Sequence, residues 1–226
     1  MREIVLARDP GVFLGSEESL QAALGVSRAT IRQAARLLER EGLLRVRRGI
    51  NGGYFGARPD IETIEKAVGT YLELLNVEAD DLIRMASVLW VEAIRKAASV
   101  RSPAMRGLAE QFRQRVLALP IDTSFHDVAE LEQDFRTALF NLIGSRYIEL
   151  IFQINMAFAH RRFPTVPADR DGTPEHAAFL GDWRNAKLME LAAIADGDQE
   201  LGGIAARHLR NVWHRRIWGD DRQVAA

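Results

Sequence analysis

The stretch Ser16–Phe55, SEESLQAALGVSRATIRQAARLLEREGLLRVRRGINGGYF, decides the fold of the N-terminal part of the chain. A first helix is predicted over Glu17–Leu24, with Ser16 as its N-cap and a glycine directly after its end. Glycine suits that place because a sharp turn needs the left-handed backbone conformation. Ser27 caps a second predicted helix, which runs to about Glu41 and is followed by another glycine. The pattern is that of two helices joined by a tight turn.

The second helix is predicted to have one apolar and one basic face. At 100° per residue, Ile31, Ala34 and Leu38 fall on one side, with Leu37 at its margin. The opposite side carries four arginines among small and amide side chains: Arg28, Ala29, Arg32, Gln33, Arg36 and Arg40. The first face is expected to pack and the second to lie open.

Two short β-type runs follow the second helix. Leu43–Arg48 and Tyr54–Phe55 flank a glycine-rich turn over 49–53, which indicates a hairpin. Two helices followed by such a hairpin predict a winged helix-turn-helix, whose second helix enters the major groove of DNA while the wing follows the backbone. A basic helix alone is also typical of a solvated surface, but here turn, arginine face and basic wing coincide.

These residues resemble the DNA-binding domain of GntR-type bacterial transcription regulators. The resemblance is carried by LGSEESL at 14–20, LGVSRATIR at 24–32 and LLEREGL at 37–43. It implies DNA contacts from the start of the second helix and from the wing tip, namely Ser27, Arg28, Ala29, Thr30, Arg32, Arg48 and Gly49. Arginines there suit guanine edges or phosphates, and hydroxyls suit phosphates. Glu18 departs from the family, which commonly has a basic residue at this position.

Charge is distributed unevenly along the 226 residues, although the whole chain carries only −1. Residues 1–59 hold ten Arg and no Lys against six Asp and Glu, a net +4, and residues 60–226 carry −5. A basic module joined to an acidic remainder fits a DNA reader with a separate regulatory domain. The chain has no cysteine, which excludes disulfides and thiolate metal sites and suits the cytoplasm. It has no apolar run of membrane-spanning length and no signal-peptide pattern, so no membrane partner is expected.

Two domains are predicted, a winged helix-turn-helix over 1–58 and an all-helical effector-binding and dimerisation domain over 59–226. Glycine and proline at 56–59 mark the boundary. Before the motif, only Arg2–Ala7 is available for the helix that GntR-type proteins usually carry there. Either the start codon is misassigned or that helix is truncated.

Residues beyond the boundary show only helical periodicity, so the fold is expected to be mainly α. Arg146–Ala159 is apolar almost all round, which places it in the middle of a bundle. Six or seven helices are expected in all, from the segments Ile61–Leu75, Asp80–Val100, Pro103–Leu119, Asp122–Ile143, Arg146–Ala159, Thr173–Ala195 and Asp198–Trp218, with a loop over Phe163–Gly172.

This helical part resembles the FadR-like branch of the GntR family, the FCD domain, through WVEAIRKAA at 90–98, FRTAL at 135–139 and AIADGD at 193–198. Many members of that branch hold a metal between an Asp, a His four residues later and two further His. Carried over, these positions fall on Glu132, Arg136, a residue near Lys187, and His208. Arg136 and Lys187 are cations, so the metal site is expected to be lost and no cofactor is predicted.

Two roles for Arg136 remain open. Its guanidinium could hold the carboxylate of a small effector by a bidentate pair, in a site with Glu132 and His208. Alternatively, Arg136 pairs with Glu132 one turn away, which leaves an apolar cavity or none. If a metal site survives, His176 and His208 are its first candidates, with an insertion between them.

The expected function is a ligand-responsive DNA-binding regulator, not an enzyme, that acts as a homodimer on a palindromic double-stranded operator. Repression is the mode we expect, although no residue distinguishes it from activation. The effector is expected to be a small carboxylate or acyl metabolite. The rival hypotheses are a helical carrier or enzyme with a degenerate DNA-binding module, and an architectural DNA-binding protein without an effector. Binding to duplex DNA that weakens with salt separates regulator from carrier.

Overall fold

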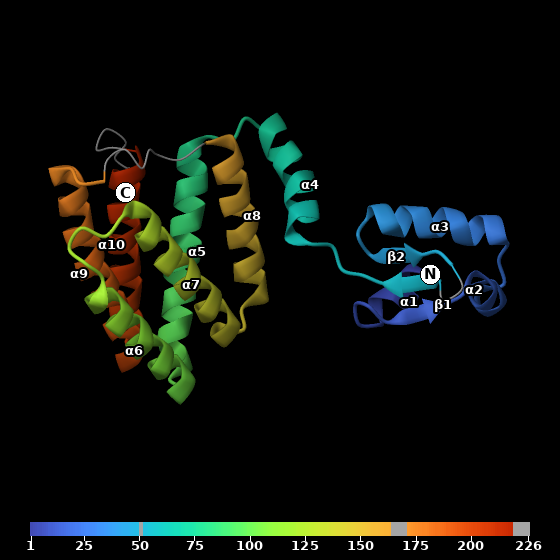
Figure 1. Ribbon diagram of the computed structural model, residues 1–226, viewed down its shortest axis with the longest axis horizontal. Helices are drawn as coiled ribbons and strands as arrows, with labels where there is room; N and C mark the ends of the chain where they lie inside the picture. The colour runs from blue at the N-terminus through green and yellow to red at the C-terminus, as the bar shows by residue number, and fades with distance from the viewer. Residues whose placement is uncertain (50–51, 164–170, 219–226) are drawn as a thin grey trace. The chain divides into compact units, whose positions relative to one another are not determined.

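A computed structural model describes residues 1–49, 52–163 and 171–218 of the chain. The chain divides into two compact units, Met1–Leu74 and Leu75–Ala226. Figure 1 shows a small mixed unit and a helical unit. The elements of the first unit are α1 (Arg2–Leu6), β1 (Phe13–Gly15), α2 (Glu17–Leu24), α3 (Arg28–Arg40), β2 (Leu44–Arg47), β3 (Gly53–Gly56) and α4 (Ile61–Leu74). Those of the second are α5 (Ala79–Val100), α6 (Pro103–Ala118), α7 (Phe125–Ile143), α8 (Arg146–Arg162), α9 (Pro174–Asp196) and α10 (Gln199–Trp218).

The predicted helix-turn-helix is present in the first unit. The Ser16 hydroxyl accepts a hydrogen bond from the Ser19 amide and caps α2, and the Ser27 hydroxyl does the same for the Thr30 amide in α3. Gly25 ends α2 in the left-handed conformation, with a φ of 65°. These local signals fix the turn and both helix starts, as predicted.

The wing contains one strand more than the predicted hairpin. β2 and β3 pair antiparallel, with Arg45 opposite Phe55 and Val46 opposite Tyr54. β1 adds to the other edge of β3, so the order is β1-β3-β2. The β1–β3 register shifts between Phe13 and Gly15. The sheet is therefore anchored to the chain that precedes α2.

The apolar face of α3 differs from the predicted face by one position. Ile31, Ala35 and Leu38 are buried there, while Ala34 is only half-buried. Leu37 is 52% exposed, so it belongs to the open side. The buried residues pack with Leu20 of α2 and with residues of the sheet in one small core. This core turns the arginine side of α3 outward.

α5 is the central helix of the second unit, because it packs against α7, α8, α9 and α10. Figure 1 shows α8, α5, α10 and α9 running side by side. Trp90, Ala93, Ile94 and Ala97 of α5 are buried in the main core. The prediction that Arg146–Ala159 lies in the middle was therefore wrong: α8 flanks α5 and buries only part of its surface.

The seven predicted helices beyond residue 60 are all present, with small shifts at their ends. α7 begins at Phe125 because the Ser124 hydroxyl caps it, and α8 continues to Arg162. The predicted loop over 163–172 lies mostly outside the described residues. The division at Leu74 groups α4 with the first unit, whereas the predicted boundary after residue 58 separates them; that boundary stays a prediction. Among the described helices, none has the length and apolar character needed to cross a membrane.

Candidate functional site

The start of α3 presents the predicted DNA-contact residues to the outside. Ser27, Arg28, Ala29, Thr30 and Arg32 are all exposed. The Ser27 hydroxyl already accepts the Thr30 amide and lies 2.9 Å from the Thr30 hydroxyl. A phosphate would therefore meet two hydroxyls that the helix cap holds in place.

A carboxylate of α2 holds the two leading arginines of α3. One oxygen of Glu17 lies 2.8 Å from Nε of Arg28, and the other lies 2.8 Å from Nε of Arg32. The Tyr54 hydroxyl donates to the second oxygen at 3.4 Å. Hydrogen bonding by Arg32 lowers the pKa of Glu17, so the group is a carboxylate at neutral pH. Sequence analysis noted Glu18, which is 82% exposed and 3.8 Å from Arg28, but missed Glu17.

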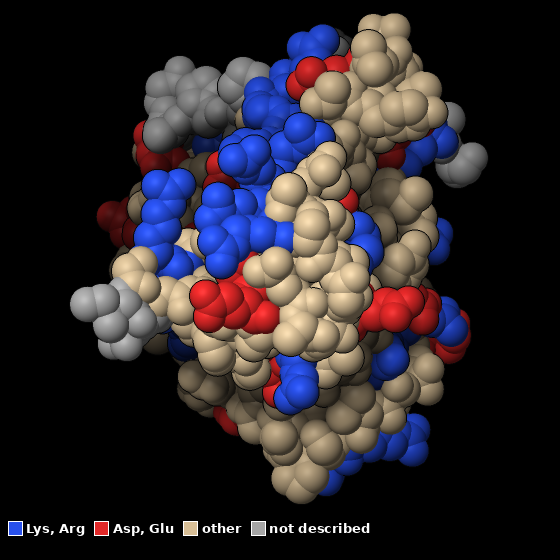
Figure 2. Space-filling model, turned by 90° about the vertical axis from the view of Figure 1, so that its right-hand side faces the viewer, with Lys and Arg blue, Asp and Glu red and all other residues tan. Residues whose placement is uncertain are grey.

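The wing supplies further cations beside α3. Arg48 and Gly49 are exposed, and the guanidinium of Arg47 lies over the Phe55 ring, 4.4 Å from its centroid. A groove of about 870 Å³ runs between α3 and the wing and is lined by Arg28, Arg32, Arg36, Arg47, Arg48 and Gly49, with Glu17, Glu18 and Glu39 also on its walls. Figure 2 shows Lys and Arg side chains gathered on one face, with carboxylates at their margin. Ile50 and Asn51, which complete the wing tip, lie outside the described residues.

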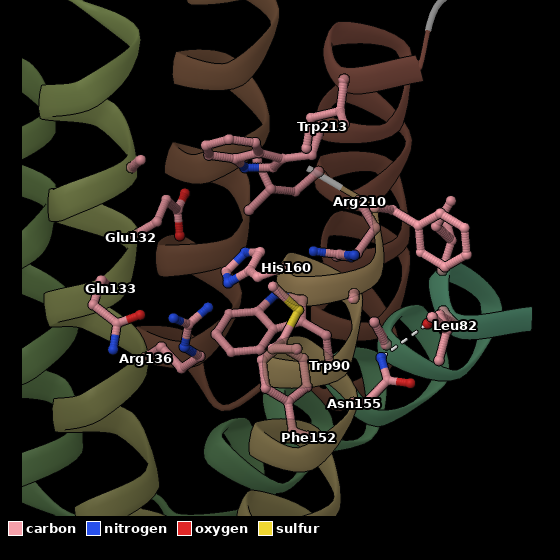
Figure 3. Close-up of a pocket in the computed structure, with 18 of the residues that line it drawn as sticks. Leu82, Trp90, Glu132, Gln133, Arg136, Phe152, Asn155, His160, Arg210 and Trp213 are labelled. Atoms are coloured by element: carbon pink, nitrogen blue, oxygen red, sulfur yellow. Dashed lines mark hydrogen bonds between the residues drawn. The ribbon is translucent and has the colours of Figure 1, made fainter. Parts of the chain in front are cut away.

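The helical unit contains a cavity of about 320 Å³ among α5, α7, α8 and α10. Its walls are mainly apolar and include Leu82, Ile83, Trp90, Phe125, Phe152, Met156, Trp213 and Ile217. Its polar lining comes from Glu132, Gln133, Arg136, Asn155, His160 and Arg210 (Figure 3). The Asn155 amide donates to the Leu82 carbonyl, so that group serves the fold. An apolar cavity with few polar groups is the usual form of a small-molecule site.

Glu132 does not pair with Arg136. Its oxygens accept hydrogen bonds from Trp183 Nε1 at 2.7 Å and from Lys187 Nζ at 2.9 Å. Lys187 is fully buried, donates also to Glu190 at 2.8 Å, and lies 3.6 Å from the centroid of the Phe135 ring. Lys187, which lies near the position expected for a metal-binding histidine, therefore binds the Glu132 carboxylate directly.

Arg136 and Arg210 reach into the cavity from α7 and α10, on either side of His160 (Figure 3). Burial lowers the pKa of Arg136, and burial together with the charge on Arg136 lowers the pKa of Arg210 to about 10. Partial burial and the Arg136 charge also lower the pKa of His160, which keeps its imidazole neutral at pH 7. Sequence analysis missed Arg210, although Trp213 and Ile217, three and seven residues on, mark the same helix face.

His208 lies apart from the other two predicted effector residues. It is exposed on the outer side of α10, in a separate groove with Arg95, Glu200 and Arg207. His176 is buried, and its Nε2 donates to the Thr123 carbonyl at 2.9 Å, as expected of a histidine that serves the fold. Within residues 1–49, 52–163 and 171–218, no three His, Asp or Glu side chains gather closely enough to hold a metal ion.

Comparison with known proteins identifies the N-terminal unit. Residues 8–51 match the family described as bacterial regulatory proteins, gntR family. The chain carries a GntR-family DNA-binding domain. The match covers α2, α3 and the strands β1 and β2, and it therefore includes the exposed arginines of α3. GntR-family regulators act by binding DNA and are not enzymes, in agreement with the expectation from the sequence.

Solved structures share the fold at low sequence identity. GntR of Streptococcus agalactiae superposes with a TM-score of 0.66 at 17% identity and covers 95% of both chains. McbR/YncC of E. coli gives 0.41 at 15% identity over 95% of this chain and 93% of that one. A GntR family member from Pseudomonas syringae pv. tomato gives 0.31 at 18% over 93% and 82%. None of the curated proteins searched matches the chain. The first of these structures supports the GntR-like combination of winged helix-turn-helix and helical domain.

Proposed function

We propose that this GntR-type chain is a ligand-responsive transcription repressor of the FadR-like branch, which binds a palindromic operator as a homodimer in the bacterial cytoplasm. The observation that carries the DNA-binding role is the groove beside α3, where Arg28 and Arg32 meet the wing arginines Arg47 and Arg48. Five arginines along one groove create the positive surface that is typical of nucleic-acid-binding proteins. A dimer follows because a single winged helix makes few base contacts, and two half-sites double them.

Roles can be assigned within the interface. Arg28 and Arg32 lie on the exposed first turns of α3 and suit guanine edges, each bidentate contact giving about 1–3 kcal/mol of discrimination. Ser27 and Thr30 suit a phosphate, because their hydroxyls sit at the N-terminus of α3. The small side chain of Ala29 lets DNA approach α3 closely. Arg48 and the backbone amide of Gly49 suit the contact between the wing and the DNA.

The effector is proposed to bind in the cavity of the helical unit as a small carboxylate or acyl metabolite. Arg136 supplies a fixed cation there, while Glu132 lines the same wall and holds Lys187. We leave His208 outside this site because it lies in a different groove. An effector that binds one arrangement of the dimer better than another shifts the population and thereby DNA affinity.

The direct test is the salt dependence of binding to duplex DNA, measured by fluorescence anisotropy with the full chain. A regulator that neutralises phosphates loses affinity steeply as salt rises, since bound counterions are released. Arg28→Ala should lower affinity for a preferred duplex by about 1–3 kcal/mol, with a smaller effect on other sequences. Arg40→Ala, at the far end of the same helix and outside the groove, is the matched control and should change affinity little.

The carrier hypothesis predicts a different result. Under that hypothesis, Glu17 and Glu18 keep phosphates away from α3, and duplex DNA binds weakly at every salt concentration. Binding that is absent at low salt, in protein whose helical unit is folded, would reject the proposed function.

A further inference from the structure

Two cations of the cavity, Arg136 and Arg210, have no ion-pair partner among the residues that the structure describes. Among the described residues, neither Arg136 nor Arg210 forms a hydrogen bond or an ion pair with another side chain, and Nε of Arg210 is buried without a partner. The guanidinium of Arg136 lies over the Phe152 ring, 5.5 Å from its centroid. Guanidiniums lose hydration when buried, so two of them at one cavity favour an anion between them.

The charge of that anion follows from the groups around it. Lys187 is already shared by Glu132 and Glu190. The two oxygens of Glu190 accept hydrogen bonds from Lys187 Nζ and from Trp90 Nε1, and burial raises the pKa of this carboxyl. Among the described residues that line the cavity, Arg136 and Arg210 face one carboxylate, Glu132, while His160 is neutral, so these side chains together carry a net charge of +1. A ligand with one negative charge neutralises this net charge, whereas a ligand with two would leave the site negatively charged.

The remainder of the cavity specifies the body of the ligand. Apart from the six polar residues already named, the walls of the cavity are aliphatic and aromatic, with Trp90, Phe152 and Trp213 among them. A volume of about 320 Å³ admits a molecule of roughly ten non-hydrogen atoms, at about 30 Å³ for each. A hydroxyl group that faces this aliphatic and aromatic part of the wall would lose its hydrogen bonds to water without finding a partner.

We propose that the effector is a monocarboxylate with an apolar, ring-sized body, whose carboxylate lies between Arg136 and Arg210. The inference rests on the proposed effector role and narrows it: sugar acids and dicarboxylates are excluded, and no metal ion is required. Arg210 thereby becomes an effector-binding residue, and aromatic walls stack against the body of the ligand.

The test is calorimetric titration of the metal-free full chain with three aromatic probes of related shape and with gluconate. 3-Phenylpropanoate should bind. 3-Phenylpropanamide, which keeps the shape but not the charge, should bind at least tenfold more weakly, as should 4-(2-carboxyethyl)benzoate, which adds a second carboxylate, and gluconate, which has a polar body. Equal binding of the acid and the amide, tighter binding of the dicarboxylate or gluconate, or no binding of 3-phenylpropanoate would overturn the inference.

Variants locate the binding site. Arg136→Gln and Arg210→Gln should each weaken 3-phenylpropanoate binding about tenfold or more, because each removes a charge-assisted hydrogen bond. Neither should lower the thermal midpoint of the ligand-free protein, because each also removes repulsion between like charges. Arg207→Gln, one turn earlier on α10 but outside the cavity, should bind like the wild type.

Unchanged binding in both cavity variants, or loss of binding together with lower thermal stability in both, would contradict the assignment. DNA binding is measured separately. Its loss would reject the proposed function, whereas failure of the probes with DNA binding intact would reject only this inference.

Discussion

Glu17 is the residue of the DNA-reading face whose role is least expected. A carboxylate near phosphates weakens binding, yet Glu17 lies 2.8 Å from both Arg28 and Arg32. It holds the two guanidiniums side by side, and fixed donors lose less entropy when they bind bases. We interpret Glu17 as a positioning residue. It lowers the affinity for DNA of any sequence but increases the preference for the operator sequence.

Glu17→Gln tests this interpretation, since the amide keeps the shape and removes the charge. Affinity for random-sequence duplex should rise, by up to about fivefold for roughly 1 kcal/mol of surface charge interaction. The ratio between preferred and random duplex should fall. Competition anisotropy with both duplexes measures the two quantities together. Glu18→Gln is the control, because Glu18 is more exposed and lies 3.8 Å from Arg28 alone.

A parallel rise in affinity for both duplexes, with the ratio unchanged, would show that Glu17 acts only as a repelling charge. Sequence analysis identified the arginines, because a helix period places them on one face. Their shared partner was missed, because the contact joins α2 to α3 across 15 residues and depends on how the helices cross.

Three helices of the second unit are joined by one buried polar network. Lys187 of α9 donates to Glu132 of α7 and to Glu190 of its own helix, and Trp90 of α5 donates to Glu190. Both Lys187 and Glu190 are fully buried. Removing one partner of a buried ion pair leaves an uncompensated charge, which costs about 3–5 kcal/mol.

Lys187→Met should therefore lower the free energy of unfolding by about 3–5 kcal/mol, measured by urea denaturation. Lys96→Met is the matched control, because Lys96 is exposed on α5 and should change stability by less than about 0.5 kcal/mol. Adding Glu132→Gln and Glu190→Gln to Lys187→Met should restore much of the loss, since the orphaned charges disappear. A Lys187→Met protein as stable as the wild type would refute the network's role.

Element ends were largely predictable from sequence, and the cavity only partly. Caps such as Ser16 and Ser27 act on their own helix, so residue spacing reveals them. β1 was missed because three residues form a strand only when β3 is beside them. On α10, His208 was expected inside, but buried Leu209 and Val212 set the inward face and leave His208 outside. The same periodicity would have predicted Arg210 correctly.

At the scale of the whole molecule, the chain joins a basic winged helix-turn-helix to an acidic helical unit that contains a cavity. Residues 1–59 carry a net charge of +4 and residues 60–226 carry −5, so the first part is the one suited to bind the negatively charged DNA. The cavity lies wholly within the second unit. We propose that a ligand in this cavity controls DNA binding through the arrangement of a dimer.

We propose that the chain binds one specific operator sequence as a dimer. Selection of binding sites from a random duplex library, followed by sequencing, tests it most directly. We predict enrichment of an inverted repeat with two equal half-sites, lost in Arg28→Ala and kept in Arg40→Ala. If the wild-type chain enriches no sequence from the library at low salt, the chain does not bind a specific operator.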